Sequence, residues 1–232
     1  LYKKALLAVK KLNNHLGKEA VFAVHITSSP SNTMNNVTGS VDSFLESLLE
    51  IASWDWCGAR IVIEHCDSYS ERFKPQKGFL PLDGEIDSVS RANEKTNINV
   101  GITINWARSV IEKRNVLGAV EHISEVARSG MLSGIMFSGV TDIKDHKYGQ
   151  WEDTHMPPAR AFDVEYYEEG SLMTVENIEA SLMACDMKAL DYIGIKLQAM
   201  PKDALIERRV GINRDAMKIL DIVTSRVHDA NV

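Results

Sequence analysis

Charged and amide side chains end several of the apolar runs in this sequence. Glu64 ends the run RIVIE, Asn105 ends GITIN and Lys196 ends YIGIK. A charge inside an apolar strand costs free energy unless it faces a paired or hydrated site. We therefore expect Glu64 and Lys196 to face an active site, where a carboxylate can serve as a base and an ammonium can transfer a proton. For both residues, a structural ion pair or a strand end already in solvent is the alternative.

The segment IEHCD, residues 63–67, holds the densest cluster of titratable groups. Carboxylates and imidazoles suit both metal binding and acid–base catalysis. Because neighbouring residues of a strand face opposite ways, we expect Glu64 and Asp67 to face the site. His65 is then expected to pack outward or onto the following loop. If a metal ion is bound, its expected ligands are Glu64, Asp67 and His155.

Three further residues are candidates because of where they lie. His155 belongs to the polar segment WEDTHMPP, and loops over a barrel mouth often carry catalytic residues. His25 and Ser138 lie at the ends of apolar runs, in VHIT and MFSG. A surface histidine is the alternative for His155, and a buried, hydrogen-bonded histidine is the alternative for His25.

Two cations indicate an anionic ligand. Arg108 lies just after GITIN, where a guanidinium can bind a carboxylate or a phosphate with two parallel hydrogen bonds. Lys77 lies in the loop segment KGF. We therefore expect a small anionic or polyhydroxylated substrate. The alternative for Arg108 is an ion pair with Glu112, four residues further along a helix.

Helical and strand patterns alternate along the chain. Apolar residues at helical spacing predict helices, and short β-branched runs bounded by turn residues predict strands. The predicted helices cover residues 1–16, 41–56, 86–95, 116–130, 174–190 and 202–227, the last with a break near Gly211. The predicted strands cover residues 21–27, 59–65, 99–105, 132–139 and 191–201.

This order of elements predicts a parallel sheet whose strands are joined by crossover helices. No strand is followed by the GxGxxG turn of a doubly wound sheet, and polar residues instead follow nearly every strand, as in a barrel. We therefore predict an α/β fold, a (β/α)8 TIM barrel that forms a single domain over residues 1–232. Because the sequence opens inside a helical pattern, we expect the first strands of the barrel to lie upstream of Leu1.

Composition indicates a globular protein that binds a small molecule. The net charge of −6 disfavours nucleic acid, because domains that bind it usually carry a basic face. No apolar run approaches the roughly 20 residues that span a bilayer, and no targeting segment is evident. Cys57, Cys66 and Cys185 show no CxxC spacing, which predicts reduced thiols and a cytoplasmic protein. A homo-oligomer is left open.

The runs VHIT, IVIEH and GITIN, with the closing helix and strand, resemble the xylose isomerase-like superfamily of TIM barrels. Within it, the run from IVIEHCD through KGF, NWARSVIEKR and MFSG resembles an uncharacterised bacterial branch named only as a domain of unknown function. The resemblance covers residues 18–200 and places VFAVHIT at the third barrel strand. Members of this superfamily typically bind a divalent metal such as Mn²⁺, Mg²⁺, Zn²⁺ or Co²⁺.

The metal ligands of the superfamily are only partly matched in this sequence. Glu64 stands where the carboxylate that ends the fourth strand is expected. Asn105 replaces an aspartate, Ser138 replaces a histidine and Lys196 replaces the glutamate of the last strand, while Arg108 lies near the usual histidine. An amide is a weak ligand and an ammonium cannot be one. We therefore expect no metal cofactor, with Mn, Mg or Zn as the alternative.

These expectations combine into an isomerase- or epimerase-like protein that acts on a sugar, sugar acid or sugar phosphate. Lys196 or His155 would move the proton next to a carbonyl, with Glu64 as the partner base. His25, Lys77, Asn105, Arg108 and Ser138 are the expected substrate-binding residues. One alternative is a lyase or hydrolase in which Lys196 forms a Schiff base. The other is a catalytically inactive barrel that binds carbohydrate.

Overall fold

The computed structural model describes residues 2–17, 20–29, 39–96 and 98–230. These residues form two compact units. The first unit contains residues 1–71 and 77–103, and the second contains residues 72–76 and 104–232. Each unit is considered by itself below, and the prediction of a single domain over the whole chain stays a prediction.

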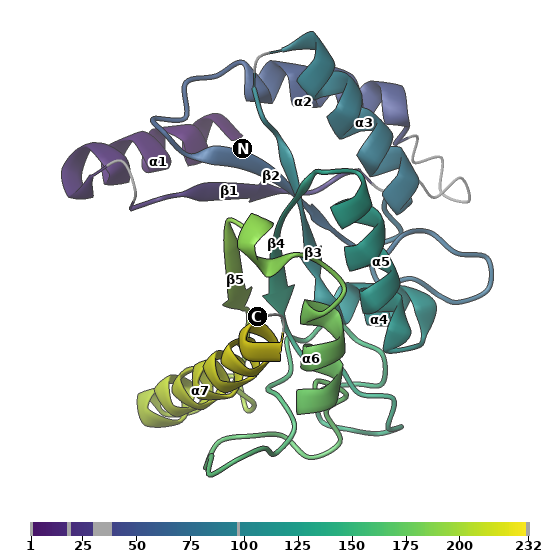
Figure 1. The fold of residues 1–232 in the computed structure, drawn as a ribbon, viewed down its shortest axis with the longest axis vertical. Coiled ribbons are helices and arrows are strands. Elements are labelled where there is room, and N and C mark those ends of the chain that lie inside the picture. Colours follow the sequence, from purple (N-terminus) through teal and green to yellow (C-terminus); the bar gives the residue numbers. More distant parts are fainter. Residues whose placement is uncertain (1, 18–19, 30–38, 97, 231–232) are drawn as a thin grey trace. The chain divides into compact units, whose positions relative to one another are not determined.

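The first unit consists of helices that alternate with parallel strands (Figure 1). Its elements are α1 (Tyr2–Leu16), β1 (Ala23–Ile26), α2 (Val41–Ala52), β2 (Arg60–His65), α3 (Leu82–Lys95) and the first residues of β3 (Gly101–Asn105). Helices α2 and α3 pack against each other. The predicted strands and helices of this part of the chain are thus all present, with shifted ends.

Strand β2 is apolar along most of its length because both of its faces are covered. Ile61, Val62 and Ile63 are all buried. β1 pairs with β2 in parallel, so that His25 lies opposite Val62 and Ile26 opposite Ile63. A continuous apolar run is typical of strands in parallel sheets, where neither face meets water.

The second unit continues the alternation of helices and strands. Its elements are the end of β3, α4 (Trp106–Lys113), α5 (Leu117–Arg128), β4 (Leu132–Phe137), α6 (Val175–Leu182), the 3₁₀ turn η2 (Met187–Ala189), β5 (Tyr192–Ile195) and α7 (Ile206–Ala230). Helix α4 packs on α5, and α6 packs on α7. β4 pairs with β5 in parallel, with Phe137 opposite Ile195. The strands follow one another in the sheet in chain order, from β1 to β5.

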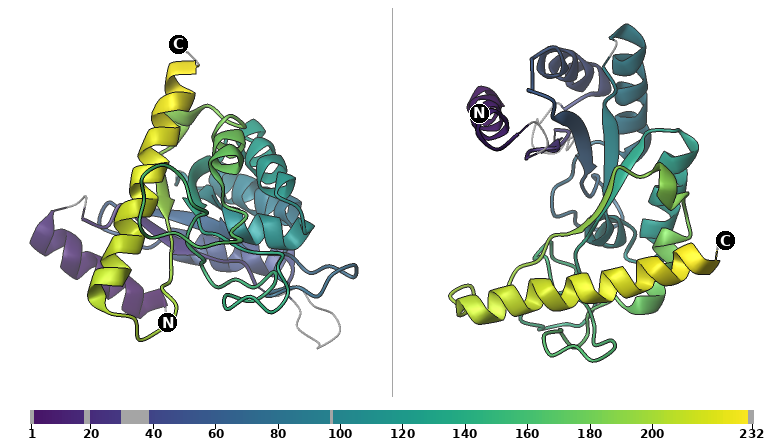
Figure 2. Two further views of the ribbon diagram at one scale, coloured as in Figure 1. Left: turned by 90° about the horizontal axis from the view of Figure 1, so that it is seen from below. Right: turned by 60° about the vertical axis from the view of Figure 1, so that its left-hand side comes forward.

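Helix α7 runs without interruption past Gly211, so the predicted break there is wrong (Figure 2). The reason is a close packing contact. A Cβ atom at this position would lie 2.5 Å from Cε2 of Tyr166. Gly211 therefore lets the tyrosine ring approach the helix backbone and does not end the helix.

Two other predicted helices are shorter than expected. Helix α2 ends at Ala52 because the chain then folds back, and the indole N–H of Trp56 donates a hydrogen bond to the carbonyl of Ile51. Helix α6 ends at Leu182 and is followed by η2, whose first turn is capped by the side chain of Asp186. In both places a local side-chain hydrogen bond competes with continuation of the helix.

Within the described part of the chain, no helix combines the length and the apolar character that crossing a membrane requires.

Candidate active site

In the first unit, His25 and Glu64 form a pair at the carboxyl ends of β1 and β2. His25 Nδ1 lies 3.1 Å from Glu64 Oε2. The parallel register explains the contact, because His25 lies opposite Val62 and Glu64 is two residues further along the same face. The glutamate side chain is 6% exposed and the histidine side chain 26%. The imidazole is therefore the member of the pair that a ligand can reach, and the buried carboxylate orients it.

His65 points away from Glu64 and packs onto helix α3, as its place on the opposite face of β2 predicts. His65 Nδ1 lies 2.7 Å from Glu85 Oε2. The other carboxylate oxygen of Glu85 accepts a hydrogen bond of 2.5 Å from the hydroxyl of Ser28. All three side chains are buried. This network joins the end of β2 to α3 and to the segment after β1.

Asp67 organises the loop that follows β2. Its carboxylate accepts a hydrogen bond of 2.9 Å from the backbone N–H of Lys77. Its own carbonyl accepts hydrogen bonds from the backbone N–H groups of Gly78 and Phe79. The buried Asp67 thus fixes the return of the loop, while the Lys77 residue is exposed. The sequence-based roles of Asp67 as a metal ligand and of Lys77 in substrate binding stay predictions.

In the second unit, Asn105, Ser138 and Lys196 lie at the carboxyl ends of neighbouring strands or their continuations. The hydroxyl of Ser138 donates a hydrogen bond of 3.1 Å to Asn105 Oδ1. The same oxygen accepts a bond of 3.4 Å from the backbone N–H of Arg108 and so caps helix α4. The backbone N–H of Lys196 donates to the carbonyl of Phe137, which places Lys196 beside Ser138.

His155 and Arg108 both contact Asp153. Arg108 Nε donates a hydrogen bond of 3.1 Å to Asp153 Oδ2, and both side chains are buried. His155 Nδ1 lies 3.3 Å from the other carboxylate oxygen, Asp153 Oδ1. The sequence singled out Arg108 as an anion ligand, whereas the structure shows a buried ion pair with Asp153. Its role in substrate binding stays a prediction.

Backbone hydrogen bonds hold the segment around His155 in place. Met156 and Gly139 exchange two of them, at 2.7 and 3.1 Å, which ties the segment to the end of β4. The backbone N–H of Gln198 donates a hydrogen bond of 2.8 Å to the carbonyl of His155. His155 therefore lies where the chain that follows β4 meets the chain that follows β5.

Tyr148 supports the chain that follows β5. Its hydroxyl donates to the carbonyl of Gln198 at 3.0 Å and accepts from the backbone N–H of Met200 at 3.1 Å. Burial, together with the charge of Glu168, raises the pKa of Tyr148 to about 12. The hydroxyl is therefore protonated throughout the neutral range and keeps its role as a donor.

We predict that Tyr148→Phe releases this chain segment. Loss of the two hydrogen bonds should lower the free energy of unfolding by about 1–2 kcal/mol and speed hydrogen exchange at the Met200 amide. Because the pKa of Tyr148 is raised above its ordinary value of 10.0 to about 12, the native protein should also lose stability as pH rises through that range. NMR-detected hydrogen exchange at the Met200 amide measures the release of the segment, and Tyr167→Phe is the control variant. Unchanged protection at Met200 would contradict the assigned role.

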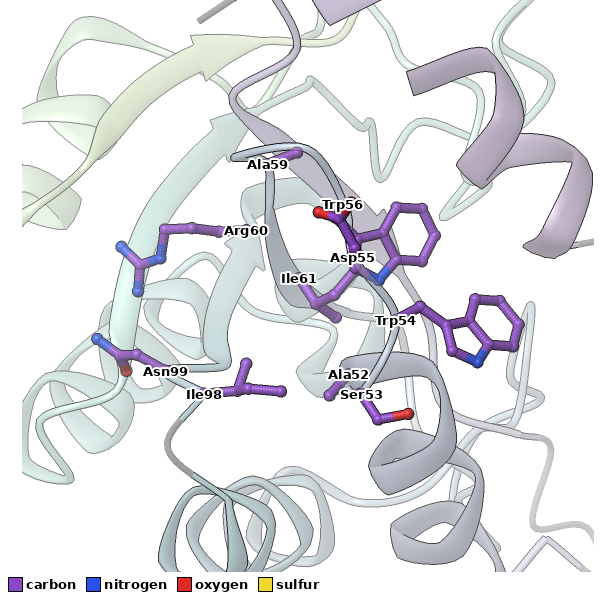
Figure 3. A pocket seen from close by; sticks show the side chains of 10 residues that line it. All are labelled: Ala52, Ser53, Trp54, Asp55, Trp56, Ala59, Arg60, Ile61, Ile98 and Asn99. Carbon is purple, nitrogen blue, oxygen red and sulfur yellow. The ribbon is translucent and has the colours of Figure 1, made fainter. Parts of the chain in front are cut away.

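A hollow of about 630 Å³ lies elsewhere in the first unit, at the amino end of β2 (Figure 3). Trp54, Arg60 and Asn99 are among its lining residues. Trp54 stacks on the ring of Trp56 at a centroid distance of 6.1 Å, and the ammonium of Lys3 lies 5.9 Å from the Trp54 ring. Its indole is thus already engaged by protein groups. Parallel barrels place their chemistry at the carboxyl ends of the strands, so we centre the candidate site on those ends.

The three cysteines are free thiols, as predicted. Burial and the neighbouring charge of Asp186 raise the pKa of Cys185 to about 11. A thiol with a raised pKa is a poor nucleophile at neutral pH because the thiolate is the reactive form. Cys185 is therefore no candidate for covalent catalysis.

The positions that bind metal in the xylose isomerase-like superfamily do not offer a matching donor set in this chain. The oxygen of Asn105 already accepts hydrogen bonds from Ser138 and from the backbone of Arg108. The ammonium of Lys196 carries no lone pair for a cation. Glu64 is the carboxylate among these positions, and His25 contacts it. We derive no chemical step through a metal at these positions.

Sequence comparison places the chain among known proteins. The family described as "Domain of unknown function (DUF4862)" matches residues 1–212. The chain belongs to this family. A relative described as "Uncharacterized protein STM3670", from Salmonella typhimurium, is 34% identical over 226 residues, which are 97% of this chain and 67% of the relative. The predicted membership of an uncharacterised bacterial branch is thereby confirmed.

A solved structure supports the fold assignment for this DUF4862 chain. It is described as a xylose isomerase domain protein from Alicyclobacillus acidocaldarius, and it matches with a TM-score of 0.52 at 12% sequence identity. The match covers 96% of this chain and 72% of that one. The predicted α/β fold of the xylose isomerase-like TIM barrel type is confirmed.

Several residues of the candidate site escaped the sequence analysis. Asp153 was seen only as a neighbour of His155, although the spacing DTH places a carboxylate two residues before the imidazole. No sequence pattern pointed to Glu85 or Tyr148, because each contacts residues far away in the sequence. His25 was expected to bind substrate, whereas its contact with Glu64 also suits acid–base chemistry.

Proposed function

We propose that this protein is an isomerase- or epimerase-type enzyme that acts on a sugar, sugar acid or sugar phosphate. The observation that carries the proposal is the His25–Glu64 pair, with a partly exposed imidazole over a buried carboxylate. Such a pair suits the removal and return of a proton next to a carbonyl group. The xylose isomerase-like fold supports the choice of substrate class by analogy only.

The proposed reaction moves protons within the substrate and needs no redox partner. A base removes the proton from the carbon next to the carbonyl, and the electron pair of that C–H bond forms an enediolate. Return of a proton to the former carbonyl carbon, with transfer of the neighbouring hydroxyl proton to the former carbonyl oxygen, gives the isomer. Return of the proton to the opposite face of the same carbon gives the epimer. We propose that His25 of the first unit, oriented by Glu64, is the base that removes this proton.

Lys196 and His155 are the proposed functional groups of the second unit. Lys196 follows β5 beside Ser138, and the backbone of Gln198 connects its segment to His155. An ammonium that is held in position can bind a negatively charged substrate oxygen within this unit. Asn105 and Ser138 are proposed to bind substrate hydroxyls through the polar face that they form together.

The proposal is tested by proton exchange in D₂O. The chain is incubated with panels of aldoses, ketoses, sugar acids and sugar phosphates, and loss of the signal of the proton on the carbon next to the carbonyl is followed by NMR. We expect exchange with one substrate class, slowed at least about a hundredfold by His25→Asn and unchanged by His15→Asn, which changes an exposed histidine in the same unit. No exchange with any panel would refute the function. A borohydride-trapped adduct at Lys196 would replace it by the Schiff-base lyase.

A further inference from the structure

The chain segment that follows β5 forms, with helix α7, a hollow of about 390 Å³ in the second unit. We propose that this hollow binds the phosphoryl group of a phosphorylated substrate. The proposal rests on the proposed function and narrows its substrate class to sugar phosphates. The residues that line the hollow are Leu197, Gln198, Ala199, Lys202, Arg209 and Asn213.

The lining carries two cations and two amides but no carboxylate. The neighbouring acids in the sequence, Asp203 and Glu207, are not among the lining residues. Among the described residues, no carboxylate forms an ion pair with Lys202 or Arg209. Two positive charges balance a phosphoryl dianion, whereas one suffices for a carboxylate, so the hollow suits a phosphomonoester better than a sugar acid.

The guanidinium of Arg209 is held in place by the backbone around it. Nε donates to the carbonyl of Ala204 at 2.9 Å, and one terminal nitrogen, Nη2, donates to the carbonyl of Lys202 at 2.6 Å. Asn213 in turn donates to the carbonyl of Arg209 at 2.8 Å. The second terminal nitrogen, Nη1, remains to bind a ligand oxygen. Because these bonds already fix the arginine, binding an anion costs less side-chain entropy.

The hollow lies close to the proposed functional groups of the same unit. Gln198, one of its lining residues, donates its backbone N–H to the carbonyl of His155. Lys196 precedes Gln198 by two residues, a distance of about 7 Å along an extended chain. The hollow is therefore built on the same stretch of chain as Lys196, and this stretch lies against the backbone of His155.

The test measures binding of inorganic phosphate, ribose 5-phosphate and glucose 6-phosphate by calorimetry at constant ionic strength. We expect Lys202→Gln to weaken binding of all three about tenfold or more, since a charge-assisted hydrogen bond is lost. The control is Lys188→Gln, which removes the same charge from an exposed lysine elsewhere in the unit and should leave binding unchanged. Tighter binding of a sugar phosphate than of free phosphate identifies a substrate subsite, and the reverse order overturns that assignment.

Three results would overturn the phosphoryl site: no phosphate binding at all, equal affinity in Lys202→Gln and the parent, or equal weakening by both lysine variants. The last would indicate bulk electrostatic attraction. The outcome is separable from that of the proposed function. If phosphate binding depends on Lys202 but no sugar shows proton exchange, the phosphoryl site stands and the isomerase fails. If proton exchange occurs only with unphosphorylated sugars, the isomerase stands and the phosphoryl site fails.

Discussion

Replacement of Glu64 by glutamine is expected to lower kcat about 10²- to 10⁴-fold on the substrate identified by proton exchange. The amide has nearly the same shape as the carboxylate and can still contact His25, which lies 3.1 Å away. It loses the negative charge that balances a proton on the imidazole. The measurement is steady-state kinetics of the purified variant, with circular dichroism to show that it is folded.

The matched control for this variant is Glu46→Gln, on the exposed side of helix α2. A double variant tests whether the two residues act as a unit. If Glu64 acts through His25, then adding Glu64→Gln to His25→Asn should cost little beyond His25→Asn alone. Additive losses would mean that Glu64 contacts the substrate independently of His25. Unchanged kcat in Glu64→Gln would remove the pair from the mechanism.

Strand alternation was enough to predict which way Glu64 and His65 point. Glu64 contacts His25, and His65 packs onto α3 through Glu85. The partner of Glu64 could not be predicted, because it depends on the register of β1 against β2. Register is a tertiary property, and both strands are short apolar runs that could pair in more than one way.

The loop residues were beyond sequence analysis for a different reason. Asp153 and Tyr148 lie outside any periodic pattern, and their roles come from contacts with Arg108 of α4 and with the segment after β5. The order of helices and strands, by contrast, can be predicted from the local spacing of hydrophobic residues. The fold was therefore predictable, with errors at helix ends such as Ala52 and Leu182, which are followed by side-chain hydrogen bonds of Trp56 and Asp186.

Helix α3 and strand β2 are joined by a buried charge network, and its removal should strongly destabilise the protein. Glu85→Ala leaves His65 and Ser28 in an apolar interior without the carboxylate that both contact. Breaking a buried pair from one side typically costs about 3–5 kcal/mol, because the remaining polar groups are not rehydrated. We expect a decrease of this size in the free energy of unfolding, measured by urea denaturation.

The control for Glu85→Ala lies on the same helix and makes the same chemical change. Glu94→Ala removes an exposed carboxylate that accepts a hydrogen bond from the hydroxyl of Ser90, and it should change stability by no more than about 0.5 kcal/mol. Glu85→Gln keeps the shape of the side chain and one acceptor oxygen. Its decrease in the free energy of unfolding should therefore lie between those of Glu85→Ala and Glu94→Ala. A loss below about 1 kcal/mol for Glu85→Ala would show that water or neighbouring groups replace the carboxylate. Because His65 follows Glu64 directly, a large loss would also mean that this network holds the end of β2 on which the proposed proton transfer depends.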